Sequence, residues 1–580
     1  MTTPTTTRTA NVTSRLRALS GDRVPIPGQP HDDLLLELDL VRGVAEAPPS
    51  SPIEAVRNRN LPLLRQVVDG LRRAAEDPHV HGLIAHVGEP QPTLAQACEL
   101  RQAVEDFRRS GKPAVCWSET YGEFGPGNVS YFLATAFDEV WMLPSGDVGL
   151  TGVVASAMFL RGALDKLGVV PELAQRHEYK SAADRLMRDH MTEAHKEMAA
   201  RLAESAMDTI ASAVAESRGL ADDQVRAAIE QAPLSAEAAV EAGLVDHLGY
   251  RDEVYDAVRS RLGDVKLRYV ERYAKHASRA AFTAVTQRKR PTVAVIQASG
   301  PIFLTRPRSA GPWSGPSVTG DGMGALLRAA GRDDTIRAVV LRVDSGGGSY
   351  LGSDVIRREV LQLKKGGKPV VASMATLAGS GGYYISMPAD VVVATAGTLT
   401  GSIGVLAGKQ VTTDALNKVG IRRESVSIGA HAEMFSSERG FTDEEWQRLE
   451  RWLDRVYSDF TGKVAIDRSL PLEHVQEVAK GRVWTGSDAR EHRLVDEIGG
   501  LDDAIEIACK RAGLVRADVQ VRRLPRTALL ERLRPAESSE HPAAAEARVA
   551  GPVDLLSAAY AVLGLPAYGV LTMPLDLRMR

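Results

Sequence analysis

Ser380 lies in a setting that suits a nucleophile. A short apolar strand signal, Pro369-Val370-Val371-Ala372, comes before it, and Gly379 and Gly381-Gly382 flank it directly. A serine at a strand-to-helix corner has its hydroxyl lifted clear of the sheet, and the glycines let an acyl group approach the backbone. N–H groups at the start of the helix then point at a developing oxyanion. Such a string is by itself more often a simple turn, so its role depends on the rest of the chain.

Composition excludes several classes of protein. The 580 residues suggest three to four domain-sized units, and 44% hydrophobic with 25% charged residues is typical of a globular chain. A net charge of −3 and the lack of a long basic face argue against a general nucleic-acid binder. The three cysteines (Cys98, Cys116, Cys509) are widely spaced, so neither a disulfide framework nor a zinc site is indicated.

An internal repeat determines the predicted architecture. Residues 71–87 resemble residues 327–343: each is a helix, a turn with an aspartate and an apolar strand, at a separation of 256. Residues 33–48 resemble residues 292–307 as strand-like segments, and beyond a four-residue insertion near residues 121–126 the separation becomes 252. Alternating strands and helices predict parallel βαβ units. Each half is therefore predicted to be an α/β domain.

The predicted division of the chain follows from composition. Residues 1–32 are expected to be disordered, residues 33–290 form the first repeat and residues 291–515 the second, after a basic segment that ends at Pro291. Residues 516–580 are a linker and an apolar tail. The tail includes an uncharged stretch from Leu555 to Leu575, interrupted by Pro566. We interpret that stretch as packing on a partner subunit or lying on a membrane.

Helical spacing predicts one long helix in each repeat. Thr442 and Glu445 fit a capping box, and an apolar stripe follows them at residues 446–460. The first repeat carries a similar stripe at Met191, Ala194, Met198 and Leu202. Both stripes are interpreted as core packing.

Differences between the two copies point to a single shared site. The position that corresponds to Ser380 is Asn128, which cannot serve as a hydroxyl nucleophile. The glycine-rich turn at residues 344–349 corresponds to residues 88–93, where two prolines remove N–H donors. Conversely, Lys180 in the first copy corresponds to Ala432. Each copy lacks what the other keeps, as expected if one site is built where the halves meet.

These residues carry a resemblance to a known family. The chain resembles signal peptide peptidase A (protease IV) of peptidase family S49, in its long tandem form, over most of residues 33–515. The segments that carry the resemblance are residues 342–349, 373–388, 400–404 and 179–181. The resemblance implies two tandem ClpP/crotonase-like repeats. In the long members the nucleophilic serine lies in the C-terminal repeat and the general-base lysine in the N-terminal one, as here.

The resemblance also implies residue roles. Ser380 would be the nucleophile, Lys180 the general base and Ser402 a hydroxyl that holds the lysine. Gly347 would donate an oxyanion-hole N–H, helped by Gly348 or Gly381. Gly346 stands where the family usually has proline, which makes this turn more flexible. No metal or other cofactor is expected. A lysine base must be neutral although its ordinary pKa is about 10.4, so the seam between the repeats must exclude water.

The predicted function is a serine endopeptidase with a Ser–Lys dyad that degrades apolar peptides such as cleaved signal peptides. A crotonase-like acyl-CoA enzyme and a catalytically inactive scaffold are the alternatives. We assign no chemistry to Asp344 and interpret His431 as a surface histidine. The resemblance implies a homo-oligomer, such as a tetramer, and association with a bacterial cell membrane. The N-terminus shows no signal peptide or anchor of the kind some members carry, so the membrane face and the mode of attachment stay open.

Overall fold

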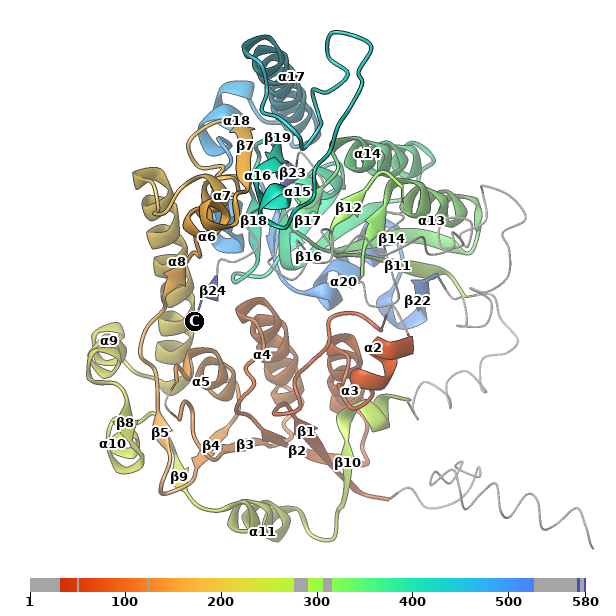
Figure 1. Ribbon diagram of the computed structural model, residues 1–580. Coiled ribbons are helices and arrows are strands. Elements are labelled where there is room, and N and C mark those ends of the chain that lie inside the picture. The colour runs from red at the N-terminus through yellow and green to blue at the C-terminus, as the bar shows by residue number, and fades with distance from the viewer. Residues whose placement is uncertain are drawn as a thin grey trace, which may run out of the picture.

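Two mainly parallel β-sheets, one from each half of the chain, form the framework of the molecule (Figure 1). The computed structural model describes residues 32–49, 52–123, 125–275, 290–305, 316–525, 571–573 and 578–579. The first sheet has the order β10-β1-β2-β3-β4-β9. Its strands are all parallel: β1 (Leu34–Asp39), β2 (Val80–His86), β3 (Ala114–Ser118), β4 (Glu139–Met142), β9 (His247–Leu248) and β10 (Lys266–Tyr269).

The second sheet has eight strands and carries the serine. Its main path is β20-β18-β16-β14-β11-β22, with β17 beside β16 and β21 beside β17, and the pairs are parallel except for β18 with β20. The strands are β11 (Thr292–Ser299), β14 (Ile336–Ser345), β16 (Val370–Gly379), β17 (Val391–Ala394), β18 (Leu399–Gly401), β20 (Val483–Thr485), β21 (Glu497–Ile498) and β22 (Gln520–Leu524). The α/β prediction with parallel sheets is confirmed.

Helices cover both faces of each sheet. In Figure 1, α3 and α4 lie between the first sheet and the second half of the chain, and α11 covers the outer face. The first-half helices are α2 (Pro52–Arg57), α3 (Leu64–Glu76), α4 (Leu94–Arg108), α5 (Asn128–Ala134), α6 (Arg161–Leu167), α7 (Asp184–Met187), α8 (Glu193–Arg218), α9 (Asp222–Gln231), α10 (Ala236–Glu241) and α11 (Arg251–Leu262). The second-half helices are α13 (Gly320–Arg332), α14 (Tyr350–Lys365), α15 (Gly381–Ser386), α16 (Thr413–Lys418), α17 (Asp443–Asp467), α18 (Leu472–Val478), α19 (Gly486–Glu491) and α20 (Leu501–Arg511).

The repeat is visible in duplicated contacts. The Lys112 ammonium donates to the carbonyls of Ala74 and Asp77, both at 2.6 Å, and Lys368 makes the same two bonds to Ala330 and Asp333 at 2.9 and 2.8 Å. Each pair of contacts ties the start of one strand to the preceding helix–turn–strand unit. The offset of 256 predicted from the sequence therefore describes equivalent positions in space.

The two predicted long helices are present. Thr442 caps α17 and forms the capping box with Glu445, as predicted. The first-half helix, α8, begins after Thr192, whose hydroxyl accepts from the His195 N–H. Met191 therefore lies before the helix and the prediction was wrong there, because Thr192 supplies a cap that the apolar spacing alone did not reveal.

Several sequence predictions fall on residues that the structure does not describe. Residues 1–31, the linker at residues 534–546 and most of Leu555–Leu575 lie outside the described residues. Of the tail, β23 (Leu571–Thr572) pairs antiparallel with β15 (Gly347–Gly348), and β24 (Arg578–Met579) pairs antiparallel with β6 (Ala155–Ser156). Among the described helices, none is long and apolar enough to cross a membrane. The predicted domain limits stay predictions: the strands of the first sheet fall within residues 34–269 and those of the second within residues 292–524.

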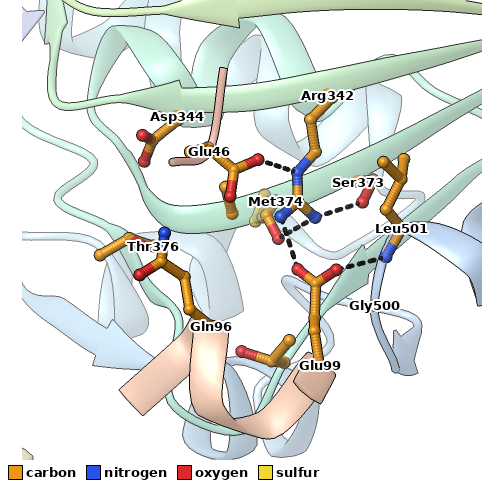
Figure 2. Close-up of polar contacts among 12 residues, drawn as sticks. Glu46, Gln96, Glu99, Arg342, Asp344, Ser373, Met374, Thr376, Gly500 and Leu501 are labelled. Atoms are coloured by element: carbon orange, nitrogen blue, oxygen red, sulfur yellow. Dashed lines mark hydrogen bonds and ion pairs between the residues drawn. The ribbon is translucent and has the colours of Figure 1, made fainter. Parts of the chain in front are cut away.

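A buried ion triad joins the two halves. Figure 2 shows Arg342, on β14, between Glu46 and Glu99 of the first half. The guanidinium donates to Glu46 at 2.8 Å and to Glu99 at 2.5 Å, and its side chain is 1% exposed. Glu99 also accepts the Leu501 N–H at 3.0 Å. Each charge is thus both paired and hydrogen-bonded, which is what burial of charge requires.

We predict that Arg342→Met destabilises the chain strongly. The substitution leaves two buried carboxylates without a cation, and breaking such a group typically lowers the free energy of unfolding by about 3–5 kcal/mol. The melting temperature measured by scanning calorimetry should fall by several degrees. Glu193→Ala, which breaks the exposed pair with Lys196, serves as the control and should leave the melting temperature unchanged. Equal melting temperatures for the two variants would show that the triad contributes nothing to the junction.

Candidate active site

Ser380 occupies a strained corner between β16 and α15. Its backbone angles are φ 54° and ψ −111°, a conformation that a residue with a side chain rarely adopts. The Ser380 N–H donates to the Gly401 carbonyl at 2.8 Å, and its own carbonyl accepts the Tyr384 N–H at 2.9 Å, which fixes the corner. Strain of this kind persists only where the surroundings enforce it, and it gathers at functional sites. The predicted strand-to-helix corner is confirmed.

Lys180 of the first half reaches Ser380 of the second. Its Nζ lies 2.8 Å from Ser380 Oγ, 3.0 Å from Ser402 Oγ and 3.0 Å from the Ser402 carbonyl. Lys180, Ser380 and Ser402 are each 0% exposed. The structure therefore brings together the three side chains that the sequence placed in one site.

Burial sets the charge of this lysine. Desolvation lowers the pKa of Lys180 well below its usual value, since water is excluded from the ammonium. A neutral amine has two N–H donors and one lone pair. These groups account for the three contacts when the two N–H groups donate to the hydroxyl and carbonyl oxygens of Ser402. The lone pair then accepts the hydrogen bond from the Ser380 hydroxyl. The geometry suits a base that can take the proton of Ser380.

Strand pairing between the two halves positions Lys180 in the site. Strand β7 (Val170–Gln175) of the first half pairs antiparallel with β19 (Leu406–Val411) of the second. Lys180 follows β7 by five residues, and the neighbouring Tyr179 N–H donates to the Lys480 carbonyl at 3.2 Å. The lysine is therefore held by backbone bonds to the half that carries Ser380.

Two glycines that sequence reasoning missed make room for this lysine. A Cβ on Gly481 would lie 2.6 Å from Lys180 Cβ, and one on Gly404 would lie 3.2 Å from Lys180 Cδ. Gly481 also has φ 81°, in the left-handed region. Gly404 belongs to the predicted motif at residues 400–404, but no sequence signal marked Gly481.

Ser402 holds the amine through both its hydroxyl and its carbonyl. Its φ is 49°, and its N–H donates to the Arg482 carbonyl at 2.7 Å. That bond ties the Thr400–Gly404 turn to the residue after Gly481, so one short network fixes both walls of the lysine slot. The arrangement fits the positioning role that the resemblance implied for Ser402.

The three predicted oxyanion glycines lie together. A Cβ on Gly347 would be 2.5 Å from the Gly381 nitrogen, and one on Gly381 would be 3.1 Å from the Gly348 nitrogen. Gly347 and Gly348 have φ of 98° and 151°, so only glycine adopts these positions without strain. The Gly347 N–H here donates to Ser345 Oγ at 3.1 Å, an acceptor that an oxyanion would have to replace. The Gly381 N–H begins α15 and has no acceptor within that helix.

The positions that correspond to Ser380 and Lys180 in the opposite halves do not form a second site. Asn128 begins α5 and its side chain bonds to the backbone of Gly152, donating to the carbonyl at 2.8 Å and accepting the N–H at 3.2 Å. Ala432, which corresponds to Lys180, belongs to the second half and lies in the loop between α16 and α17. His431, beside it, has one nitrogen 3.6 Å from a carboxylate oxygen of Glu444. The first half therefore lacks a counterpart of Ser380, and the second half lacks a counterpart of Lys180.

Asp344 opens the turn that contains the oxyanion glycines. Burial raises the pKa of its carboxyl to about 6, with the nearby charge of Glu46 adding to the effect. It accepts the Leu377 N–H at 3.2 Å, which ties the end of β14 to β16. We read it as a structural residue of the turn. Within the described ranges, no cluster of three or more His, Cys, Asp or Glu is placed to hold a metal ion.

Comparison with known proteins identifies the family. The model of peptidase family S49 matches residues 106–266 and 362–515, which fall in the first and second halves respectively. The chain belongs to peptidase family S49. It is a serine protease, and the family domain is present in tandem. The acyl-CoA and inactive-scaffold alternatives are set aside by this membership.

Individual relatives agree with the family. The chain is 34% identical over 457 residues to the chloroplastic serine protease SPPA of Arabidopsis thaliana, covering 78% of this chain and 66% of the relative. It is 31% identical over 467 residues to Protease 4 of Salmonella typhi, covering 78% and 72%. Among solved structures, ClpP1 (N165D) of Listeria monocytogenes matches with a TM-score of 0.24 and 12% identity, covering 36% of this chain and 94% of that one.

We predict that Lys180→Met stabilises this S49 protease more as the pH falls. Burial lowers the pKa of the amine in the folded chain, whereas in the unfolded chain the amine binds a proton below about pH 10.4. Lowering the pH therefore favours unfolding of the wild type by about 1.4 kcal/mol per pH unit, until the lowered folded pKa is reached. Melting temperatures measured between pH 10 and pH 7 should show the difference between variant and wild type growing toward pH 7.

The exposed Lys196→Met is the control and should follow the wild type at every pH. A constant difference between Lys180→Met and the wild type across this range would mean that Lys180 is charged in the folded chain.

Proposed function

We propose that this protease is an endopeptidase in which Ser380 and Lys180 form the catalytic dyad, and that it degrades apolar peptides such as cleaved signal peptides. The observation that supports the dyad most directly is the 2.8 Å separation of Lys180 Nζ and Ser380 Oγ, with both side chains fully buried. A lysine in water would be charged and could not act as a base. Burial lowers the pKa of Lys180 and so favours the neutral amine that a base requires.

The proposed reaction uses Ser380, Lys180, Ser402 and backbone N–H groups of the glycine turn. The Lys180 lone pair accepts the Ser380 proton as Oγ attacks the peptide carbonyl. The resulting ammonium, held by Ser402, returns the proton to the leaving amine, and an acyl-enzyme remains. Water, deprotonated by the same lysine, then releases the acid. In this proposal, backbone N–H groups of Gly347, Gly348 and Gly381 donate to the developing oxyanion, and one such donor contributes on the order of 10²–10³ in rate.

Apolar side chains beside the dyad support an apolar peptide as substrate. Met198 and Leu202 on α8 pack with Leu399 on β18 and Val483 on β20, and all four are buried. This cluster, which we call the seam cluster, is contributed by both halves and lies next to Tyr179 and therefore to Lys180. Cleaved signal peptides are rich in such apolar side chains.

Ser380→Ala should abolish hydrolysis of an apolar peptide ester, with a fall of at least about 10³-fold in kcat, because the nucleophile is lost. Labelling by a fluorophosphonate probe should vanish as well. Ser386→Ala is the matched control: this buried serine lies on the same helix but donates only to the Gly382 carbonyl at 2.8 Å, so activity should be kept. Retained labelling of Ser380→Ala would remove this residue from the mechanism.

We also propose that copies of the chain assemble head to tail through the unused counterpart of the β7–β19 pairing. Shifted by 252, β7 corresponds to residues 422–427, and β19 corresponds back to residues 154–159. Residues 421–428 have no regular secondary structure, and Figure 1 shows this segment, in teal, projecting beside α17. Val426 is 99% and Ile428 94% exposed, and Val154 and Met158 are each 63% exposed.

Pairing residues 422–427 of one copy with residues 154–159 of the next would repeat between chains the contact that exists within one. In a single chain, β24 pairs at Ala155 and Ser156, and the neighbouring copy would replace it. A contact of this kind uses different surfaces on the two partners and closes into a ring when its rotation permits. A tetramer is one such ring.

The double variant Val426→Glu with Ile428→Glu should dissociate the assembly to single chains of 62.4 kDa, because two charges would be buried at the contact. Light scattering after size exclusion measures the mass. Ile466→Glu, at an apolar site on α17 that is 74% exposed, is the control and should keep the wild-type mass. A wild type that elutes as a single chain would overturn the assembly.

Association with a bacterial membrane also remains a proposal. Its support is the apolar class of substrate that the seam cluster would accept. The uncharged stretch Leu555–Leu575 is described only at residues 571–573, which contact the chain itself.

A further inference from the structure

The C-terminal segment lies beside the glycine turn of the active site. Leu571 pairs with Gly348 and Thr572 with Gly347 in antiparallel register, and the Met573 N–H donates to the Gly346 carbonyl at 2.9 Å. Adding a strand to an exposed edge is a common way for a protein to bind an extended peptide, since main-chain bonds hold it whatever its sequence. The segment Leu571–Met573 is therefore bound as a peptide ligand would be.

Its two described side chains, those of Leu571 and Met573, are both buried. Met573 is 2% exposed and packs in the seam cluster with Met198, Leu202 and Val483. Leu571 is 0% exposed and packs with the core of the second half. Residues two apart on a strand face the same way, so the site takes apolar side chains at alternate positions of its ligand.

Met573 also lies directly against Gly379, the residue before Ser380. A Cβ added to Gly379 would fall 2.1 Å from Met573 Sδ, and one added to Gly347 would fall 2.2 Å from the Leu571 carbonyl. The segment thus touches both the residue before Ser380 and the proposed oxyanion turn. Ser380 itself is completely buried, so a peptide that is to be cut must displace whatever covers it.

We propose that the active-site cleft binds the chain's own Leu571–Met573 as a tethered competitor, and that its preferred ligands are extended peptides with methionine or leucine at alternate positions. The inhibition in this proposal rests on the proposed dyad. Binding of Leu571–Met573 beside the glycine turn does not. Residues 526–570 connect the segment to the last strand of the second sheet. Covalent attachment holds the segment at an effective concentration of about 1 mM, so even a segment with a dissociation constant of about 0.1 mM would fill the cleft about nine-tenths of the time.

Binding can be tested without catalysis. In a Ser380→Ala background, a fluorescent peptide of sequence Leu-Thr-Met-Pro-Leu is titrated and its anisotropy recorded. Adding Met573→Glu should tighten binding of this peptide about tenfold, because a carboxylate is excluded from the seam cluster and the tethered segment leaves the cleft. Ile466→Glu, which adds the same charge at an exposed site, should leave the affinity at its parent value. Equal affinities with and without Met573→Glu would overturn the proposal.

Activity supplies the second readout. With Ser380 intact, Met573→Glu should lower the KM for an apolar peptide ester about tenfold at unchanged kcat, as expected when a competitor is removed. An unchanged KM beside Ser380-dependent hydrolysis would overturn the tethered competitor and leave the dyad standing. Lack of hydrolysis in every variant that keeps Ser380 would overturn the dyad, while the binding titration would still decide whether the segment occupies the cleft.

Two further results would contradict the inference. If diluting the wild type lowers its KM, the segment acts on a neighbouring copy instead of on its own cleft. If the mass of the wild type falls by the loss of C-terminal residues while Ser380→Ala stays intact, the segment is a substrate and not a competitor. A KM independent of dilution and an intact mass in both proteins support the tethered competitor.

Discussion

A lysine amine kept out of water is the constraint on which the rest of the structure depends. Desolvation is the one cause that lowers the pKa of Lys180, and no cation is needed beside it. Each unit by which the pKa falls corresponds to about 1.4 kcal/mol of lost interaction with water, so the folded chain is destabilised at neutral pH by the group that would act as its base. The two oxygens of Ser402 offset part of that loss with hydrogen bonds.

The junction between the halves contains two buried basic side chains, Arg342 and Lys180, in different surroundings. At the triad, Arg342 is buried with Glu46 and Glu99, so the cation keeps its charge and is paired. At the dyad, Lys180 is buried beside neutral hydroxyls and loses its charge. Arg342 lies on β14, which runs directly into the glycine turn. The ion triad thus anchors the strand that presents the turn, while the β7–β19 pairing anchors the lysine.

Sequence reasoning could find the repeat because its signals are local: a lysine, an aspartate turn and an apolar strand recur at a fixed offset. It could find Ser380 and Lys180 because the copies differ at those positions and because motifs of a known family surround them. It could not find Gly481, since nothing in the sequence shows that this glycine faces Lys180, 301 residues earlier, nor could it pair Glu99 with Arg342 across 243 residues. Long-range partners of this kind are fixed by packing, which spacing along the chain does not encode.

Each half has lost one of the two side chains of the dyad since the duplication. Peptide binding and catalysis therefore both require the junction between the halves. Asn128 closes on Gly152 in the first half, and Ala432 leaves the second without a lysine, so neither half alone holds both a nucleophile and a base. The seam cluster draws on α8 from one half and on β18 and β20 from the other. A peptide that binds there touches both halves, and Met573 does so in this structure. Any motion that parts the halves would expose Lys180 to water, restore its charge and remove the base, so the packing of the seam, more than the chemistry of either side chain alone, sets whether the serine can react.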